Sequence, residues 1–256
     1  MSNVNLINKL ILGDCLEVMQ EIDNKSIDLI LCDLPYEVTA CSWDFIIDLQ
    51  KLWIQYNRII KNNSATLLFA SQPFTTKLIN SNFSCFKYCW YWNKDKGGNF
   101  ATAKYQPFRV IEEIVVFGNG SIKYIPQMEI ANKNNIRLRD VTYKQNEETT
   151  HGIASKEFKV SENHNEKLRY PKNLINIKST EKECNNINRL HPTQKPVSLL
   201  EYLIKTFSFE NNIILDNCFG SGSTLVAAKN LNRQFIGIEK EKVYYDIARK
   251  RLELDN

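Results

Sequence analysis

The sequence predicts a doubly wound α/β fold whose central sheet is mostly parallel. Short aliphatic runs of strand length alternate with segments whose apolar residues recur at helical spacing. This alternation occurs near both ends of the chain and is typical of strand-helix-strand units. The 256 residues are enough for one large domain of this class with an inserted lobe.

The two ends of the chain carry the regular elements. Strands are expected over residues 5–13, 27–32, 65–70, 86–93, 112–117, 213–215 and 234–239. Helices are expected over residues 15–22, 48–60, 75–80, 197–207, 225–230 and 243–252. Between them periodicity fades, and Asn, Lys, Glu and Thr become frequent. We therefore expect a domain made of residues 1–117 and 189–256, interrupted by an irregular lobe over 118–188.

Composition restricts the class of protein. With 43% hydrophobic and 24% charged residues, the chain is expected to be globular rather than disordered. No apolar stretch is long enough to span a bilayer and no signal-peptide pattern is present, so we expect a cytoplasmic protein without a membrane partner. The seven cysteines lack metal-ligand spacing, so free thiols and no metal site are expected. A net charge of +4 permits a polyanionic partner without requiring one.

One candidate site follows the buried strand over residues 27–32. The next residues are Asp33, Leu34, Pro35 and Tyr36. Proline fixes its own φ and keeps Leu34 out of helical geometry, so a stiff extended loop is expected at the carboxyl end of this strand. A carboxylate, exposed carbonyls and a stacking ring would suit a flat molecule that bears an amine. Alternatively, Asp33 caps the next element and Tyr36 packs on the surface.

A second candidate site runs from Asp216, at the end of one strand, to Glu239, at the end of the next. Between them, Gly220 and Gly222 allow a tight turn and close approach of a ligand at a helix N-terminus. A strand-terminal acid such as Glu239 can accept hydrogen bonds from both ribose hydroxyls. A third glycine and a phosphate-binding lysine are missing, which favours a nucleoside cofactor without pyrophosphate. A purely structural turn is the alternative.

A long loop over residues 94–109 joins two expected strands. It carries Lys94, Lys96, Lys104 and Arg109, interleaved with aromatic residues. Positive charge next to aromatic rings suits the phosphates and bases of a nucleic acid. A solvated hairpin excursion is the alternative.

The motifs together resemble a known family. Asp33-Leu34-Pro35-Tyr36 is similar to the Asp-Pro-Pro-Tyr motif of the amino-methyltransferases that act on DNA, with Leu34 in place of the first proline. Phe219-Gly220-Ser221-Gly222 is similar to their Phe-x-Gly-x-Gly motif, with both glycines kept and Phe219 directly before the first, and His191-Pro-Thr-Gln-Lys-Pro196 matches a third segment. The catalytic motif precedes the cofactor motif, which is the permuted order of the β-class. The preceding Asp216-Asn217-Cys218 departs from the usual Asp-Pro-Phe but keeps the acid.

The resemblance implies a fold and a set of site residues. The fold is a seven-stranded Rossmann-like methyltransferase sheet, with target recognition in the inserted lobe. S-adenosyl-L-methionine is the implied cofactor; Glu239 would bind its ribose, Asp14 would lie near its adenine, and Thr193 and Lys195 near its amino-acid end. The cofactor site would comprise Asp14, Asp33, Thr193, Lys195, Asp216, Asn217, Phe219, Gly220, Gly222, Ser223, Thr224 and Glu239.

The expected activity is site-specific methylation of double-stranded DNA, as in restriction-modification systems. Asp33 and the Leu34 carbonyl would hold the amine hydrogens of a flipped base, on which Tyr36 would stack. An acid rather than Ser at the start of the motif favours adenine N6. The alternatives are N4-cytosine methylation, an RNA or protein amide methyltransferase, and a DNA-binding subunit without catalytic activity. The last is suggested by Leu34 and Asn217-Cys218, which depart from the family motifs. A homodimer and a cognate restriction endonuclease are open expectations.

Overall fold

The computed structural model describes residues 6–35, 47–130, 168–179 and 194–253. The chain divides into two compact units, one made of Met1–Ile125 with Lys172–Asn256 and the other of Pro126–Pro171. Residues 118–125 and 172–179, which the sequence pattern assigned to the inserted lobe, therefore pack with the first unit. The reason is local pairing: Ile125 N donates to Thr206 O at 2.8 Å, and residues 174–176 join the main sheet.

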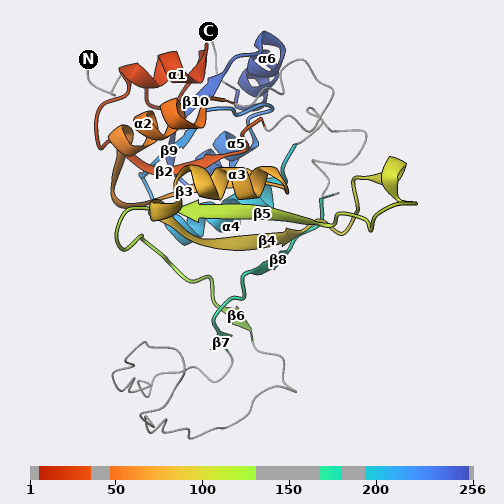
Figure 1. The fold of residues 1–256 in the computed structure, drawn as a ribbon. Coiled ribbons are helices and arrows are strands. Elements are labelled where there is room, and N and C mark those ends of the chain that lie inside the picture. Colours follow the sequence, from red (N-terminus) through yellow and green to blue (C-terminus); the bar gives the residue numbers. More distant parts are fainter. Residues whose placement is uncertain (1–5, 36–46, 131–167, 180–193, 254–256) are drawn as a thin grey trace, which may run out of the picture. The chain divides into compact units, whose positions relative to one another are not determined.

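The first unit is built on one large sheet (Figure 1). The bounds of its strands are β1 Lys9–Leu12, β2 Ile27–Cys32, β3 Ile60–Ala70, β4 Phe86–Asn93, β5 Ile111–Phe117, β8 Leu174–Asn176, β9 Ile213–Asp216 and β10 Gln234–Glu239. They form an eight-stranded sheet in the order β1-β10-β9-β2-β3-β5-β4-β8. Neighbouring strands are parallel except on the two sides of β5. The mostly parallel sheet is confirmed, with one short edge strand, β8, beyond the seven expected.

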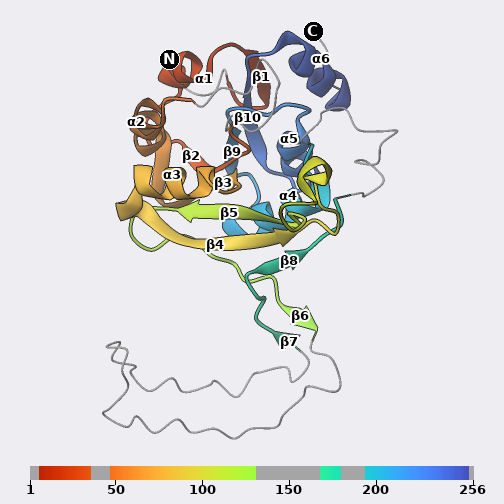
Figure 2. The ribbon, with the colours of Figure 1, turned by 45° about the vertical axis from the view of Figure 1, so that its right-hand side comes forward.

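Helices cover both faces of this sheet, as a doubly wound fold requires (Figure 2). The α-helices are α1 Cys15–Val18, α2 Leu49–Ile59, α3 Phe74–Ser81, α4 Val197–Phe207, α5 Ser223–Asn230 and α6 Lys242–Arg251. Short 3-10 turns are η2 Met19–Glu21, η3 Phe83–Cys85 and η4 Phe100–Thr102. One hydrophobic cluster joins α1, α2 and α3 to the sheet, and the other joins α4, α5 and α6 to it. The doubly wound arrangement is therefore confirmed.

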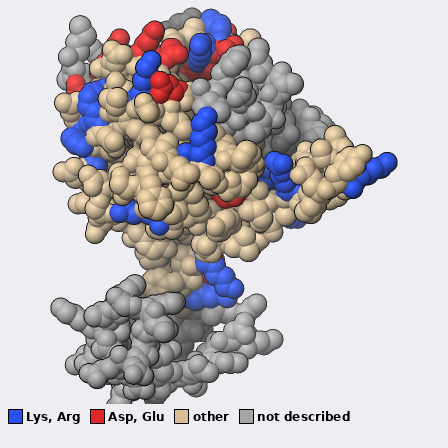
Figure 3. Space-filling view, viewed as in Figure 1, with Lys and Arg blue, Asp and Glu red and all other residues tan. Residues whose placement is uncertain are grey.

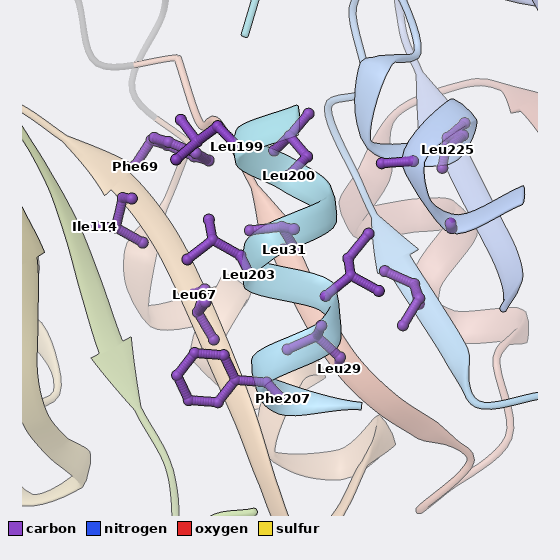
Figure 4. Close-up of a cluster of buried hydrophobic side chains, with 14 of the residues drawn as sticks. Leu29, Leu31, Leu67, Phe69, Ile114, Leu199, Leu200, Leu203, Phe207 and Leu225 are labelled. Atoms are coloured by element: carbon purple, nitrogen blue, oxygen red, sulfur yellow. The ribbon is translucent and has the colours of Figure 1, made fainter. Parts of the chain in front are cut away.

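The alternation of side chains along β2 shows how one strand serves both layers. Leu29 and Leu31 belong to the cluster beneath α4, whereas Ile30 and Cys32 belong to the cluster beneath α2. Figure 4 shows the first cluster, in which leucines of α4 face the aliphatic side chains of β2 and β3. A strand buried on both faces reads as a continuous apolar run, which is why β2 was found in the sequence with its observed bounds.

The second unit contributes one two-stranded sheet among the described residues. Strand β6 (Glu129–Ile130) pairs antiparallel with β7 (Leu168–Arg169). The pair carries a cross-strand ion pair, with Arg169 Nη2 2.9 Å from Glu129 Oε2. No described helix has both the length and the apolar character needed to span a membrane.

Candidate active site

Four acids lie at one edge of the sheet because the strands that carry them are parallel neighbours. Leu12 pairs with Glu239, Gly237 with Asp216, and Ile30 with Leu215. The carboxyl ends of β1, β10, β9 and β2 therefore lie side by side. Asp14, Glu239, Asp216 and Asp33 stand at or just beyond these ends, in that order. The two candidate sites of the sequence thus share one edge, where open α/β sheets bind ligands.

One carboxylate oxygen of Asp33 contacts a lysine, and the described residues leave the other without a hydrogen-bond donor. Its Oδ2 lies 2.6 Å from Lys195 Nζ, a contact between residues 162 positions apart in the chain. Its Oδ1 is buried, and among the described residues no group donates a hydrogen bond to it. A buried acceptor without a donor is unusual in a folded protein, because it forfeits its solvation without replacement. The geometry therefore leaves an acceptor for a donor that the described residues do not supply.

A row of alternating charges continues from Asp33. The ammonium of Lys195 lies 2.8 Å from Glu112 Oε1, and Lys94 Nζ lies 3.2 Å from Glu112 Oε2. Lys195 is buried and also lies over the ring of Phe69, 4.9 Å from its centroid. We call Asp33, Lys195, Glu112 and Lys94 the charged row. Strand β5 is antiparallel to its neighbours, so its first residues, including Glu112, lie at the edge where the parallel strands end.

The two acids of this row respond differently to their surroundings. Burial raises the pKa of Asp33 to about 6, with Lys195 lowering it and Glu112 raising it. Burial would also raise the pKa of Glu112, but Lys195 and Lys94 together hold it below its usual value. Glu112 is thus the firmly ionised member, since it lies between two lysines. Asp33 changes its protonation state at a pH closer to neutrality than Glu112 does.

Leu34 and Pro35 continue the loop after β2. The Leu34 side chain is only 2% exposed and belongs to the hydrophobic cluster beneath α2. The residue that departs from the family motif is therefore an apolar anchor that fixes the start of the loop beside Asp33. Tyr36, expected to stack on the base, lies outside the described residues, as does Thr193.

The glycine turn between β9 and α5 has the geometry that its sequence predicted. Gly220 and Gly222 adopt φ values of +52° and +77°, which side-chain-bearing residues rarely adopt. A Cβ on Gly222 would also lie 2.9 Å from Ala248 Cβ, so α6 packs directly on the turn. Phe219, which is buried, begins the turn, and its carbonyl accepts a hydrogen bond from Gly222 N at 2.8 Å.

Glu239 is tied to this turn. Its Oε2 accepts a hydrogen bond from Gly220 N at 2.8 Å, and its Oε1 accepts one from Glu241 N at 2.9 Å. Burial raises the pKa of this carboxyl, and the backbone donors partly counter that effect. Each carboxylate oxygen can accept a further hydrogen bond. The side chain can therefore support the turn and accept a diol together.

The other predicted cofactor residues around β9 are buried. Asp216 Oδ1 accepts from Cys218 N at 3.2 Å, and burial raises the pKa of Asp216 to about 7, although a hydrogen bond with Thr224 lowers it. Asn217 Oδ1 accepts the Tyr56 hydroxyl at 2.5 Å, which ties the β9 end to α2. Ser223 Oγ accepts from Arg251 Nη1 at 2.8 Å, so this hydroxyl serves the contact with α6.

Asp14 stands at the end of β1 and caps α1. Its Oδ1 accepts a hydrogen bond from Leu16 N at 2.9 Å, and its Oδ2 lies 3.7 Å from Lys240 Nζ. The side chain remains partly exposed beside the β10 end. An acid at this position can contact a ligand that lies over β1 and β10.

The loop over residues 94–110 projects from the sheet (Figure 1). Its phenylalanines, Phe100 and Phe108, pack edge to face with their ring centroids 5.2 Å apart, while Tyr105 is 88% exposed. Lys96, Lys104 and Arg109 are exposed, and in Figure 3 the projecting loop is mostly tan with blue at its outer end. Lys94 differs from the other basic residues, because its ammonium is paired with Glu112.

Two site features were missed in the sequence. The sequence pattern indicates Glu112 only as the start of a strand, and the family resemblance implies a position near the cofactor for Lys195 rather than one beside Asp33. An acid near the start of an otherwise aliphatic strand was an available signal for Glu112. No sequence signal pairs Lys195 with Asp33, because the contact depends on how α4 packs on β2 and β3.

Comparisons with known proteins agree with this geometry. A family model described as DNA methylase, of the N6/N4 type, matches residues 27–250. The chain is 27% identical to the Type II methyltransferase M.HinfI of Haemophilus influenzae, covering 98% of this chain and 70% of that protein. It is 24% identical to the Type II methyltransferase M.HpaI of Haemophilus parainfluenzae, covering 96% of this chain and 74% of that protein.

Solved structures share the fold. The crystal structure of an M1.HpyAVI–SAM complex superposes with a TM-score of 0.64 at 24% identity, covering 96% of this chain and 99% of that one. The PvuII DNA methyltransferase, described as cytosine-N4-specific, gives a TM-score of 0.63 at 16% identity and covers 97% and 86%. At these identities the likeness concerns the fold.

Proposed function

Because the chain belongs to the family of N6/N4 DNA methylases, we propose that its strand-end site methylates N6 of adenine in DNA. The general activity, without regard to which base is modified, is that of a DNA methyltransferase that uses S-adenosyl-L-methionine. The preference for adenine is supported by the acid at the start of the Asp33-Leu34-Pro35-Tyr36 motif. The PvuII structural neighbour is a cytosine-N4 enzyme, so the fold does not distinguish the two bases.

The observation that carries the proposal is Asp33 Oδ1, a buried acceptor to which no described residue donates a hydrogen bond. An exocyclic amine is a weak nucleophile because its lone pair is delocalised into the ring. Asp33 Oδ1, which no described residue engages, would accept one amine hydrogen, and the Leu34 carbonyl would accept the other. The amine lone pair then points at the methyl group. The amine nitrogen would form its bond to the methyl carbon as the S–C bond breaks with its electrons left on sulfur, and Asp33, which would hold one amine hydrogen, would accept the proton that is released.

The residues at the strand ends fit the cofactor. S-adenosyl-L-methionine supplies a methyl group that its sulfonium charge makes transferable, so no metal is required. We assign the ribose to Glu239 and the surroundings of the adenine to Asp14, with the glycine turn allowing close approach. Asp216, Asn217, Phe219, Ser223 and Thr224 would form the wall beneath it. Lys195 lies against Asp33, which supports assigning it a position between the base and the amino-acid end of the cofactor.

DNA binding is assigned to the projecting loop and the second unit. A base inside a duplex cannot reach Asp33, so it must be flipped out, and Tyr36 would stack on it. Lys96, Lys104 and Arg109 are exposed and available for phosphates, whereas the charge of Lys94 is engaged by Glu112. We assign target recognition to the second unit, Pro126–Pro171. A homodimer and a partner endonuclease remain proposals by family analogy.

The base preference is tested by the chemistry of the product. We expect duplex DNA from a methylation-free host, incubated with the protein and cofactor and digested to nucleosides, to yield N6-methyldeoxyadenosine in mass spectrometry. Asp33→Ala protein serves as the blank. N4-methyldeoxycytidine in place of the adenine product would overturn the preference. Methylation of RNA in preference to DNA in a competition assay would support an RNA enzyme, and cofactor binding without any labelled product would support a silent subunit.

Removing two exposed charges from the loop should weaken DNA binding. Lys96→Ala combined with Lys104→Ala is expected to reduce affinity about tenfold at moderate salt, and to lower the slope of log K against log salt by about 2. Fluorescence anisotropy with a labelled duplex measures both quantities. Lys51→Ala with Lys77→Ala, which removes two exposed lysines from α2 and α3, is the control. Equal losses in the two double variants would contradict a specific role for the loop.

A further inference from the structure

Strand β5 contains a buried charge that the fold does not require. Its other residues are aliphatic or aromatic except for Glu113, which is half-buried and accepts the Thr75 hydroxyl at 3.2 Å. Glu112 is only 6% exposed. A buried carboxylate is costly even when paired, and a packed apolar residue is often at least as stabilising. Stability alone therefore does not account for an acid at this position.

The contacts of Glu112 lead to the catalytic carboxylate. Its Oε1 lies 2.8 Å from Lys195 Nζ, and the same ammonium lies 2.6 Å from Asp33 Oδ2. Its Oε2 lies 3.2 Å from Lys94 Nζ, which holds Glu112 from the other side. The ammonium of Lys195 is thus held between two acids from different strands. The remaining oxygen of Asp33 is the buried Oδ1 without a described donor.

We propose that Glu112 is a positioning residue for methyl transfer, anchoring Lys195 on one oxygen of Asp33 so that the other oxygen accepts the amine of the target base. The inference rests on the proposed catalytic role of Asp33. An ammonium with a single anchor could move to either oxygen of Asp33 or bridge both. Glu112 removes that freedom, because an ammonium drawn toward its Oε1 contacts Asp33 only at Oδ2.

Glu112 also affects the protonation equilibrium of Asp33. Among the described residues, the charged or titratable groups that face Asp33 are Lys195, Glu112 and Lys94 in the charged row, Asp216 at the end of the neighbouring strand β9, and Cys32 at the end of β2 itself. The cation of Lys195 favours the ionised form of Asp33, and the anion of Glu112 opposes it. Removing either charge should therefore shift the protonation of Asp33, and the two shifts should have opposite signs.

The test is the pH dependence of single-turnover methyl transfer at saturating cofactor and DNA. The wild-type rate should rise with pH as Asp33, whose pKa burial raises to about 6 in the unliganded protein, loses its proton. In Glu112→Gln this rise should move to lower pH, because a neighbouring negative charge is gone. In Lys195→Met it should move to higher pH, because the neighbouring positive charge is gone. Glu113→Gln, on the same strand but outside the charged row, should leave the profile unchanged.

A second measurement separates anchoring from charge. Glu112→Ala removes both the charge and the acceptor and should lower kcat about tenfold at pH 8, with KM values for DNA and cofactor nearly unchanged. Glu112→Gln keeps an acceptor for Lys195 and should recover most of that loss. If Lys195→Met fails to fold because two carboxylates lose their cation, the double variant Lys195→Met/Glu112→Gln removes one of them and should still show the shift to higher pH.

The experiments distinguish a failure of the inference about Glu112 from a failure of the proposed function. Absence of transfer by the wild-type protein on any DNA would refute the proposed function itself. Transfer by the wild type with profiles that do not move, or that move in the same direction in both variants, would overturn only the inference about Glu112. Equal kcat values for wild type and Glu112→Ala at pH 8 would overturn the anchoring role.

Discussion

Asp33→Ala is expected to lower the rate of methyl transfer by about 10³-fold or more while leaving cofactor affinity within about twofold. The variant removes the buried acceptor Oδ1 that would orient the amine, and no described residue replaces it. The fold should tolerate the change because Lys195 keeps its contact with Glu112. Single-turnover labelling of DNA measures the rate, and calorimetric titration with S-adenosyl-L-methionine measures the affinity.

The affinity and the rate together decide the role of Asp33. Thermal unfolding checks that the variant is folded, and Asp33→Asn, which keeps one acceptor oxygen, should fall between wild type and Asp33→Ala. Retained transfer by Asp33→Ala would refute the catalytic assignment. Loss of cofactor binding in the same variant would make Asp33 primarily a cofactor residue.

Glu239→Ala is expected to weaken cofactor binding about 100-fold, which corresponds to about 3 kcal/mol. Two hydrogen bonds from a ribose diol to a carboxylate account for a loss of this size. Calorimetric titration gives the affinity, and Glu239→Gln, with one acceptor oxygen, should lose about tenfold. Glu241→Gln, which neutralises the neighbouring acid, is the control.

Part of this loss could arise from loosening the turn, since Glu239 Oε2 accepts from Gly220 N at 2.8 Å. A double-mutant cycle separates the two effects. Its first change is Glu239→Ala, and its second replaces the parent compound, S-adenosyl-L-methionine, with an analogue that lacks the ribose 2′-hydroxyl. The analogue should bind wild type more weakly than the parent, but Glu239→Ala should bind both nearly equally. Additive losses would show that Glu239 acts on the turn and not on the ribose.

The local elements could be predicted because their signals are local. The observed bounds of β2, β4, β10 and α4 agree with those expected from periodicity and from strand-ending acids. The irregular segment was less readable, and β8 was missed because Leu174–Asn176 is too short to show a period. Its pairing with β4 moves residues 172–179 from the expected insert into the first unit.

The sequence by itself determined the order of the elements, the glycine turn, and the acids that end the parallel strands, because each is set by a few consecutive residues. It also contained the motifs that indicated the family. Only the tertiary structure decided that Lys195 lies between Asp33 and Glu112. These residues belong to segments brought together by the strand order β2-β3-β5 and the reversed direction of β5. Strand direction depends on packing across the whole sheet, so no local pattern encodes it.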